Sequence, residues 1–370
     1  MKLAFALFKY FPYGGLQRDC LKIAEECVRR GHSVDIYCIK WAGPSPRGIS
    51  VHVVNAKAWR NYRRYEIFAL LLRQQLDRIK YDGVIGFNRM AGLDFYFAAD
   101  PCFALKCEQR QFWYRYLPHS QSFLRSELMV YGKDSTTEIM LLSEQEIPQI
   151  QRLYGTTTQR FHLLPPGVVK NQFVAVDYYR QRAEFRQELG LVDEQKLLLM
   201  VGSGFKVKGV DRAIAALASL PEPLRQRTVL MILGRDNSSK FKRQARRLGI
   251  SDKVKFLGGR DDAARFFFAA DLLVHPAYRE AAGMVLLEAV AAQLPVLATD
   301  TCGYSFHIQR SGAGCIHQSP FDLQRFSSEL TTMLEKDPRV WQQAAHKYVV
   351  TTDIFGLATR AVDVIEQGLQ

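Results

Sequence analysis

A loop followed by a helix is predicted for the stretch Pro276-Ala-Tyr-Arg-Glu-Ala-Ala-Gly-Met-Val-Leu-Leu-Glu-Ala-Val290. The segments 271–275 before it and 295–299 after it are short apolar runs, typical of buried strands. The helix is expected to begin near Gly283, so that Glu280 falls in the loop and Glu288 falls inside the helix. A strand, loop, helix and strand in this order are the repeating unit of a parallel α/β sheet.

The first turn of this helix is a candidate anion site. Its backbone amides, from Ala282 to Val285, would lack partners within the helix and would point outward with partial positive charge. Glu280 before the turn and Glu288 after it suit a ligand with phosphate in its middle and hydroxyl groups at both ends. A nucleotide sugar has that shape. The alternative is a helix whose two glutamates face the solvent.

The chain of 370 residues is long enough for about two domains, and Pro165-Pro166-Gly167 is its strongest break. Before the break, an apolar run at 3–8, a helical pattern at 16–30 and a second run at 32–39 predict a βαβ start. Gly14 and Gly15 lie between the first apolar run and the helical pattern, without the glycine spacing of a dinucleotide fingerprint. The pair permits close approach of a ligand, or it forms only a tight turn.

A second alternating series follows the break, with strands expected at 196–201, 228–233 and 254–257 and helices between them. This alternation predicts doubly wound parallel sheets, which bind ligands beyond the carboxyl ends of their strands. Lys206, Lys208, Arg260 and Glu280 all follow such strands, so we expect them along one cleft wall. Two lysines there could neutralise a diphosphate leaving group, or could be surface charge. Arg260 is the weaker candidate because Asp261 and Asp262 offer it partners.

The composition indicates a globular protein with an anionic partner. The net charge is +13, which suits nucleic acid, an anionic membrane face or a phosphorylated substrate. The seven scattered cysteines, with no CxxC, predict reduced thiols and no zinc site. No apolar run is long enough to cross a bilayer, and the N-terminal run is too short for a secretory signal, so we expect a cytoplasmic protein.

Asp100 and two basic segments are the remaining candidates. Asp100 lies at the carboxyl end of the expected strand 95–98 and could orient or deprotonate an acceptor hydroxyl, or could be a turn or cap residue. The segments 59–65 and 103–131 interleave bases with aromatic residues. That pattern suits an anionic bilayer surface, stacking on nucleic-acid bases, or a partly buried helix with a solvated basic face.

Further motifs extend the pattern and carry a resemblance to a known family. The segment from Glu280 to Glu288 is similar to the E-x7-E motif of the retaining glycosyltransferases of family four, which have the GT-B fold. The segments 9–19, 86–94, 164–167, 208–212 and 302–304 resemble the members of that family that move glucose from UDP-glucose to an inner-core heptose of lipopolysaccharide. The resemblance runs over nearly the whole chain.

The resemblance implies an architecture: an acceptor-side domain over 1–166, a nucleotide-sugar domain over 167–350, and a helix over 351–370 that crosses back to the first domain. Both domains would be Rossmann-like and would face each other across a cleft. It also implies UDP-glucose as donor, a lipid-linked heptose as acceptor, no catalytic metal or other cofactor, and no nucleic-acid partner. The enzyme would lie at the cytoplasmic face of the inner membrane, with segment 103–131 on the anionic surface.

The resemblance also implies roles for single residues. Glu280 would hold the donor hexose and Glu288 the ribose. The uracil would lie near Arg260 and the acceptor near Asp100. The diphosphate would be bound by Lys208 and by the amides of Ala281, Ala282, Gly283, Met284 and Val285, while Gly14 and Gly15 would approach the donor.

The chain departs from the family pattern at the donor phosphates. Ser203 stands where the family commonly has an arginine, and Val207 stands where a second base is expected. Lys206 and Lys170 are candidate substitutes. Other functions left open are a different hexosyltransferase of the family, a UDP-sugar epimerase with the GT-B fold, and a non-catalytic basic binding module.

Overall fold

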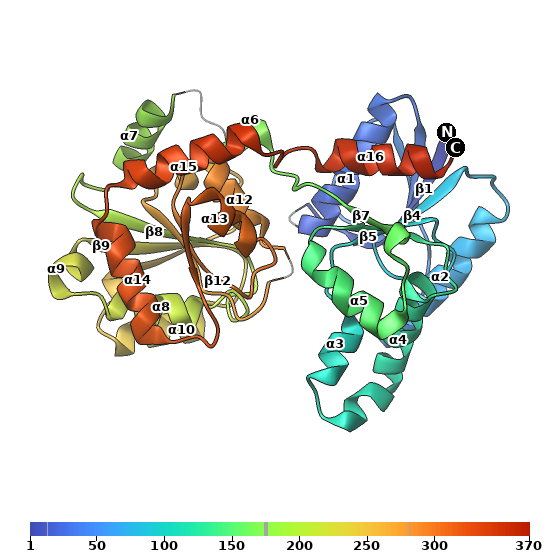
Figure 1. Ribbon diagram of the computed structural model, residues 1–370, viewed down its shortest axis with the longest axis horizontal. Coiled ribbons are helices and arrows are strands. Elements are labelled where there is room, and N and C mark those ends of the chain that lie inside the picture. Colours follow the sequence, from blue (N-terminus) through green and yellow to red (C-terminus); the bar gives the residue numbers. More distant parts are fainter. Residues whose placement is uncertain (13, 174–176, 281) are drawn as a thin grey trace. The chain divides into compact units, whose positions relative to one another are not determined.

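The computed structural model describes residues 1–12, 14–173, 177–280 and 282–370. The chain divides into two compact units: unit 1 is Met1–Gly167 with Gly356–Gln370, and unit 2 is Val168–Phe355. Each unit is a parallel sheet with helices packed against it (Figure 1). The division falls one residue after the boundary that the Pro-Pro-Gly segment suggests, and the α/β fold class is confirmed.

The sheet of unit 1 has seven strands in the order β3-β2-β1-β4-β5-β6-β7, and the pairs are parallel. Its third strand in this order, β1, is the continuous apolar run predicted near the N-terminus, with residues 3–7 buried. The strands are β1 (Lys2–Tyr10), β2 (Ser33–Trp41), β3 (Ile49–Val53), β4 (Gly83–Gly86), β5 (Phe95–Ala98), β6 (Glu138–Leu141) and β7 (Phe161–Leu163).

The helices of unit 1 follow the apolar spacing of the sequence. In the first of them, Cys20, Ile23, Ala24 and Cys27 recur at helical spacing and are fully buried. The helices are α1 (Gly15–Arg29), α2 (Asn61–Leu76), α3 (Phe103–Glu108), η1 (Phe112–Tyr116), α4 (Pro118–Tyr131), η2 (Glu144–Glu146), α5 (Ile147–Tyr154), η3 (Thr158–Arg160) and α16 (Leu357–Gly368).

Helix α16 belongs to unit 1 although all of unit 2 precedes it in the chain. It packs against α1, and Arg30 donates to Asp363 at 2.8 Å and to Glu366 at 2.7 Å. The helix begins at Leu357 rather than at residue 351, because the loop before it ends with Gly356. Residues 351–370 therefore comprise the end of α15, this loop and α16.

The sheet of unit 2 has six strands in the order β10-β9-β8-β11-β12-β13, again parallel. The predicted strands at 196–201 and 228–233 are confirmed to the residue, since both are unbroken apolar runs. The strands are β8 (Lys196–Val201), β9 (Thr228–Leu233), β10 (Val254–Gly258), β11 (Leu272–His275), β12 (Val296–Thr299) and β13 (Gly314–His317).

The helices of unit 2 bury their apolar sides on both faces of this sheet, and one core joins α8, α10 and α14 to the strands. They are α6 (Lys170–Phe173), α7 (Tyr178–Glu188), α8 (Val210–Ala218), α9 (Glu222–Gln226), α10 (Ser239–Arg247), η4 (Ser251–Lys253), α11 (Ala263–Ala269), α12 (Met284–Ala291), α13 (Ser305–Ser311), α14 (Leu323–Glu335) and α15 (Pro338–Thr351).

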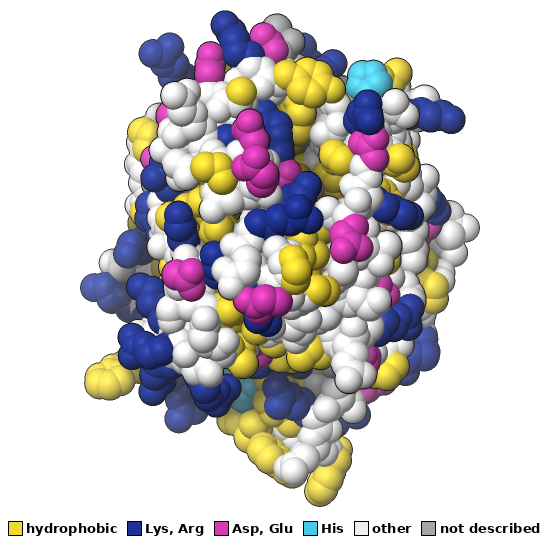
Figure 2. Space-filling view, turned by 90° about the vertical axis from the view of Figure 1, so that its left-hand side faces the viewer, with side chains coloured by type: hydrophobic (Ala, Val, Ile, Leu, Met, Phe, Trp, Pro, Cys, Tyr) yellow, Lys and Arg dark blue, Asp and Glu magenta, His cyan; other side chains and the backbone are white. Residues whose placement is uncertain are grey.

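The excess positive charge is spread over the surface. Lys and Arg side chains are frequent on the face of unit 2 seen in Figure 2, with Asp and Glu interspersed among them. Helix α10 alone carries Lys240, Lys242, Arg243, Arg246 and Arg247. None of the helices described is both long and apolar enough to span a membrane.

Both sheets contain a topological switch point, where strand order reverses. In unit 2 the switch lies between β8 and β11, which are hydrogen-bonded neighbours. In unit 1 it lies between β1 and β4. Loops that leave such neighbouring strands diverge and open a crevice at the carboxyl edge, which is where α/β sheets bind ligands.

Candidate active site

The loops after β8 and β11 meet at the switch point of unit 2. The backbone amide of Tyr278 donates to the carbonyl of Val207 at 2.8 Å, which joins the two loops directly. Gly209, with φ +75°, lies so close to the carbonyl of Pro276 that a Cβ on it would overlap that oxygen. The arrangement holds Lys208 and Glu280, one on each loop, in a fixed relation.

Lys208 and Glu280 form the centre of the candidate site. The ammonium of Lys208 contacts Oε2 of Glu280, and their side chains are only 21% and 15% exposed. Burial lowers the pKa of Lys208 from its ordinary value, so its charge is costly unless an anion lies beside it. Glu280 supplies that anion, and a diphosphate would supply another.

His275 lies behind this pair at the end of β11. It is fully buried, and its Nε2 lies 3.5 Å from Oε2 of Glu280. Burial lowers the pKa of His275 to about 3, and the neighbouring Lys208 ammonium adds to the shift. The imidazole is therefore neutral at physiological pH and adds no charge to the site.

Arg212 secures the loop that carries Glu280. Its guanidinium donates to the carbonyls of Pro276 and Ala277 at 3.3 and 3.2 Å. It also stacks over the rings of Tyr278 and Phe321, at 3.7 and 3.9 Å from their centroids. Arg212 belongs to the quoted segment 208–212, but the sequence alone does not reveal this role, because its acceptors are carbonyls of a distant loop.

A second loop, after β12, completes the support of Glu280. The amide of Glu280 donates to the carbonyl of Thr301 at 3.1 Å, and the amide of Gly303 donates to the carbonyl of Glu280 at 3.1 Å. The amide of Tyr304 donates to the carbonyl of Ala282 at 2.7 Å. The quoted segment 302–304 thus contributes backbone bonds that fix both sides of the Glu280 loop.

Helix α12 begins as the sequence predicts, with Gly283 as its N-cap at φ +86°. The amides of Met284 and Val285 lie in its first turn, where amides have no acceptor within the helix. Glu288 lies one turn further and is 9% exposed, so it is not a solvent-facing residue. Ala281, predicted to contribute an amide, lies outside the described residues.

Lys206 and Arg260 have other partners. The ammonium of Lys206 donates to Asp211 at 2.7 Å and to the hydroxyl of Tyr278 at 3.0 Å. Arg260 makes a two-pronged pair with Asp262, at 2.7 and 2.6 Å. Of the three bases expected along this wall, only Lys208 contacts Glu280 in the part of the chain that the structure describes. Lys206 and Arg260 are each paired with an aspartate instead.

Ser203, which departs from the family pattern, and Lys170, a candidate substitute, both have contacts of their own. The hydroxyl of Ser203 accepts from the amide of Arg235 at 3.1 Å. The ammonium of Lys170 lies 5.7 Å from the ring centroid of Phe355. Among the described residues, neither Ser203 nor Lys170 forms a hydrogen bond or ion pair with Glu280 or Lys208, so their part in donor binding stays a prediction.

Gly14 and Gly15 lie at the switch point of unit 1, at the start of α1. Gly14 is the N-cap of that helix, and a Cβ on it would overlap the side chain of Gln17. A Cβ on Gly15 would meet no heavy atom within 4 Å. Gly15 therefore leaves open space at the helix terminus, whereas a side chain on Gly14 would have to displace those of Gln17 and Phe11.

Asp100 lies at the carboxyl edge of the same sheet, just after β5, and its side chain is exposed. It does not cap the next helix. The first amides of α3, those of Phe103 and Ala104, donate instead to Glu127 at 2.5 and 2.9 Å. The carbonyl of Asp100 accepts from Arg89 at 2.8 Å, so the loop is held and the carboxylate is left toward solvent.

Arg89 and Glu127 form a buried ion pair beneath Asp100, with side-chain exposures of 12% and 0%. Arg89 also donates to the hydroxyl of Tyr96 at 3.0 Å, and Glu127 accepts from the hydroxyl of Tyr154 at 2.6 Å. The sequence gives no sign of this pair, because Glu127 is an isolated acid on α4 and its partners come from separate loops.

No cluster of three metal-ligating side chains occurs in the part of the chain that the structure describes. All seven cysteines are free, as predicted from their scattered spacing, and six of them are buried. Their thiols serve as small apolar core groups.

Comparison with known proteins identifies the family. The family model described as "Glycosyltransferase Family 4" matches residues 13–172, and the one described as "Glycosyl transferases group 1" matches residues 181–356. The lipopolysaccharide glucosyltransferase WaaG of Escherichia coli (strain K12) is 40% identical over 372 residues, which span 100% of both chains. An uncharacterised glycosyltransferase of Methanocaldococcus jannaschii is 24% identical over 82% of this chain and 81% of its own.

Solved structures agree. The crystal structure of WaaG superimposes with a TM-score of 0.93 at 40% identity, covering 98% of this chain and 99% of that one. Anabaena Alr3699/HepE, solved in complex with UDP-glucose, shares the fold with a TM-score of 0.77 at 19% identity, covering 99% and 100%. The chain therefore belongs to the family four glycosyltransferases, has their GT-B fold, and is a homologue of WaaG.

Proposed function

We propose that this enzyme transfers glucose from UDP-glucose to a heptose of the lipopolysaccharide core, with retention of anomeric configuration. The observation that carries the proposal is the Lys208–Glu280 pair beside the first turn of α12, at the switch point of unit 2. The full-length identity of 40% to a lipopolysaccharide glucosyltransferase supports the choice of sugar and acceptor.

The proposed reaction follows from this arrangement. The bond between C1 of glucose and the β-phosphate oxygen breaks, and its electron pair leaves with UDP. The acceptor oxygen forms its bond to C1 on the same face, and its proton passes to the departing phosphate oxygen. Lys208 and the amides of Met284 and Val285 stabilise the charge that develops on that phosphate, since fixed donors act strongly in a partly buried site.

Glu280 has a second part in the proposal. Its carboxylate holds the hexose hydroxyls, while Glu288 binds the ribose hydroxyls. Binding of the donor diphosphate beside Lys208 would draw that ammonium from Glu280 and leave the carboxylate for the sugar. Asp100 in unit 1 is the candidate to orient the acceptor hydroxyl, and no metal or other cofactor takes part.

Purified enzyme with a panel of nucleotide sugars and a truncated core acceptor tests the proposal. We expect transfer from UDP-glucose and a product whose new bond keeps the donor's configuration by NMR. Glu280→Gln should lower kcat/KM by about a hundredfold or more. Glu194→Gln, on an exposed loop of the same unit, is the matched control. An enzyme that converts UDP-glucose to another UDP-sugar without any acceptor would be an epimerase, and the proposal would be wrong.

We also propose that residues 103–131 bind the anionic cytoplasmic face of the inner membrane. In η1, Phe112 is 82% and Tyr116 is 68% exposed, and the helix buries no residue. Lys106, Arg110, Arg115 and Arg125 lie on the same segment. Exposed aromatic rings beside cations favour an anionic lipid surface, because the rings enter the interface and the bases meet the headgroups.

Sedimentation with vesicles tests the membrane proposal. Binding should increase with the fraction of anionic lipid and weaken with salt. Phe112→Ser with Tyr116→Ser should reduce it strongly, whereas Tyr179→Ser, which removes a ring that is 73% exposed on unit 2, should not. Binding that ignores lipid charge would contradict the proposal.

A further inference from the structure

A cavity of about 650 Å³ lies at the carboxyl edge of the unit 1 sheet, beyond β1 and β2. It is lined by Lys9, Ile39, Lys40, Ala56, Lys57, Ala58, Trp59 and Arg64. None of the roles proposed above uses it. It lies at the same sheet edge as Gly14 and Gly15, since Gln17 on α1 donates to the carbonyl of Lys9 at 3.0 Å.

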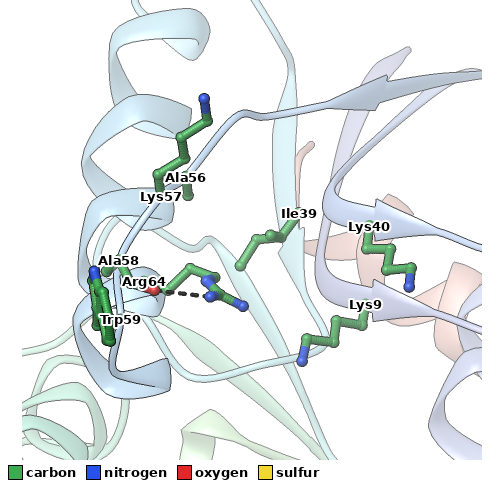
Figure 3. Close-up of a pocket in the computed structure, with 8 residues that line it drawn as sticks. All are labelled: Lys9, Ile39, Lys40, Ala56, Lys57, Ala58, Trp59 and Arg64. Atoms are coloured by element: carbon green, nitrogen blue, oxygen red, sulfur yellow. Dashed lines mark hydrogen bonds between the residues drawn. The ribbon is translucent and has the colours of Figure 1, made fainter.

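The charge of the lining is of one sign. Four of the eight lining residues are bases and none is an acid. Lys9 and Lys40 are register partners on the adjacent strands β1 and β2, so their Cα atoms lie side by side, and Figure 3 shows their ammonium groups turned to opposite sides. Like charges opposite one another in a sheet are destabilising, and a bound anion would remove that cost.

These bases have no acidic partner among the residues that the structure describes. Arg30 of the same unit, by contrast, binds Asp363 and Glu366. Figure 3 shows Lys9 and Arg64 turned toward one another across the cavity, Lys40 above Lys9, and Lys57 extended away. The anion site therefore consists of Lys9 and Arg64, and Lys40 adds positive charge on the neighbouring strand.

Trp59 gives the cavity an exposed aromatic wall. Its side chain is fully exposed, and the apolar residues Ile39 and Ala56 lie on the lining nearby. Arg64 donates to the carbonyl of Ala58 at 2.8 Å, which fixes the backbone next to Trp59 (Figure 3). An indole in water next to cations matches a sugar ring that carries an acidic group, because the ring's C–H face packs on the indole while the acid meets the bases.

We propose that this cavity binds an anionic substituent of the acceptor saccharide, a phosphate monoester or a sugar carboxylate, with Trp59 packed against the sugar ring. The inference rests on the proposed function and names the acceptor's chemistry: the enzyme selects an acidic saccharide. The guanidinium of Arg64 is suited to two-pronged binding of either oxyanion. The ammonium groups of Lys9 and Lys40 add charge without a fixed geometry.

Steady-state kinetics with three acceptors tests the proposal: the native acidic core fragment, the fragment after phosphatase treatment, and the fragment with its carboxylates reduced to alcohols. Wild-type enzyme should prefer the native fragment, by about tenfold or more in kcat/KM, over whichever form has lost the recognised group. Lys9→Met with Lys40→Met should abolish that preference by raising the acceptor KM, while the donor KM stays the same. Lys80→Met, an exposed lysine beyond α2, is the control.

A binding measurement separates this proposal from the proposed function. Calorimetric titration of the acidic core fragment into the enzyme needs no turnover, and the double variant and Trp59→Ala should each weaken binding about tenfold or more. If binding follows this pattern but no glucose is transferred, the proposed function is wrong and the site stands. If wild-type enzyme binds or uses charged and neutral fragments equally, the site is wrong. The double variant could also lose vesicle binding while its fragment binding stays unchanged. That result would show that the cavity binds the membrane, and the proposal would be wrong.

Discussion

Lys208 and Glu280 neutralise each other across two loops that leave neighbouring strands of the unit 2 sheet. The two loops are fixed to each other: Gly209 lies against the carbonyl of Pro276, and Arg212 holds the carbonyls of Pro276 and Ala277. The pair is therefore preorganised, and ligand binding has to displace a contact that already exists. This relation gives the first two predictions.

Replacing Lys208 with Met should lower kcat/KM by about a hundredfold or more, since one positioned donor to the leaving group is lost. It should also cost about 1–3 kcal/mol of stability, because Glu280 is left partly buried without its partner. Lys208→Arg should keep most of the stability and little of the activity. Equal activity of the Met variant and the wild type, measured at saturating acceptor, would contradict the assignment.

Gly209→Ala should reduce both stability and activity. A non-glycine residue at φ +75° costs about 1–3 kcal/mol, and here the new Cβ would also push the Pro276 carbonyl and with it the Glu280 loop. Gly249→Ala is the matched control, because φ is +72° there and no heavy atom lies within 4 Å of the new Cβ. Chemical denaturation and kcat/KM together check this: the control should lose stability only.

The buried imidazole of His275 should make the enzyme sensitive to acid. Its folded pKa of about 3 lies below the ordinary value of 6.5, so the unfolded chain binds the extra proton first. Above pH 6.5 this difference in pKa does not affect the free energy of unfolding. Between pH 6.5 and 3 it lowers the free energy of unfolding by about 1.4 kcal/mol for each pH unit.

His275→Asn should therefore lose less stability than the wild type between pH 6.5 and 4, measured as unfolding free energy at each pH. His346→Asn, which removes an exposed histidine of α15, should follow the wild-type curve. Parallel curves for wild type and His275→Asn would show that His275 is not the group that titrates.

Glu127→Gln should destabilise the enzyme by about 3–5 kcal/mol, because it leaves the buried guanidinium of Arg89 without its carboxylate. It should also raise the acceptor KM, since Arg89 holds the loop that presents Asp100. Glu108→Gln breaks the exposed pair with Arg152 and should leave the stability nearly unchanged, because solvent screens that pair. A purely structural role would leave the acceptor KM of the folded variant unchanged.

Much of the fold can be read from the sequence because its strands are continuous apolar runs. β8 and β9 are predicted to the residue for that reason. Strand β13 is not anticipated, since Gly314 begins it and two of its four residues are half-buried. The start of α16 is placed too early, because helical periodicity does not reveal that residues 352–356 form a loop.

The candidate site is predictable only in part. The spacing of Glu280 and Glu288 identifies the loop and the helix start. It cannot distinguish Lys206 from Lys208, because the direction of each side chain depends on the glycine conformations of their loop. Glu127 and the Lys9–Lys40 pair depend on strand order and on helix packing, which no local pattern encodes.

The place of α16 in unit 1 has a consequence for synthesis of the protein. Its buried side chains, among them Leu357, Ala361 and Ile365, cover α1, yet the ribosome makes them only after all of unit 2. Until then the first unit exposes an apolar stripe on α1, and Arg30 has Glu26 as a partner but lacks Asp363 and Glu366. The apolar side of α1 therefore stays exposed to solvent until residues 357–368 have been translated.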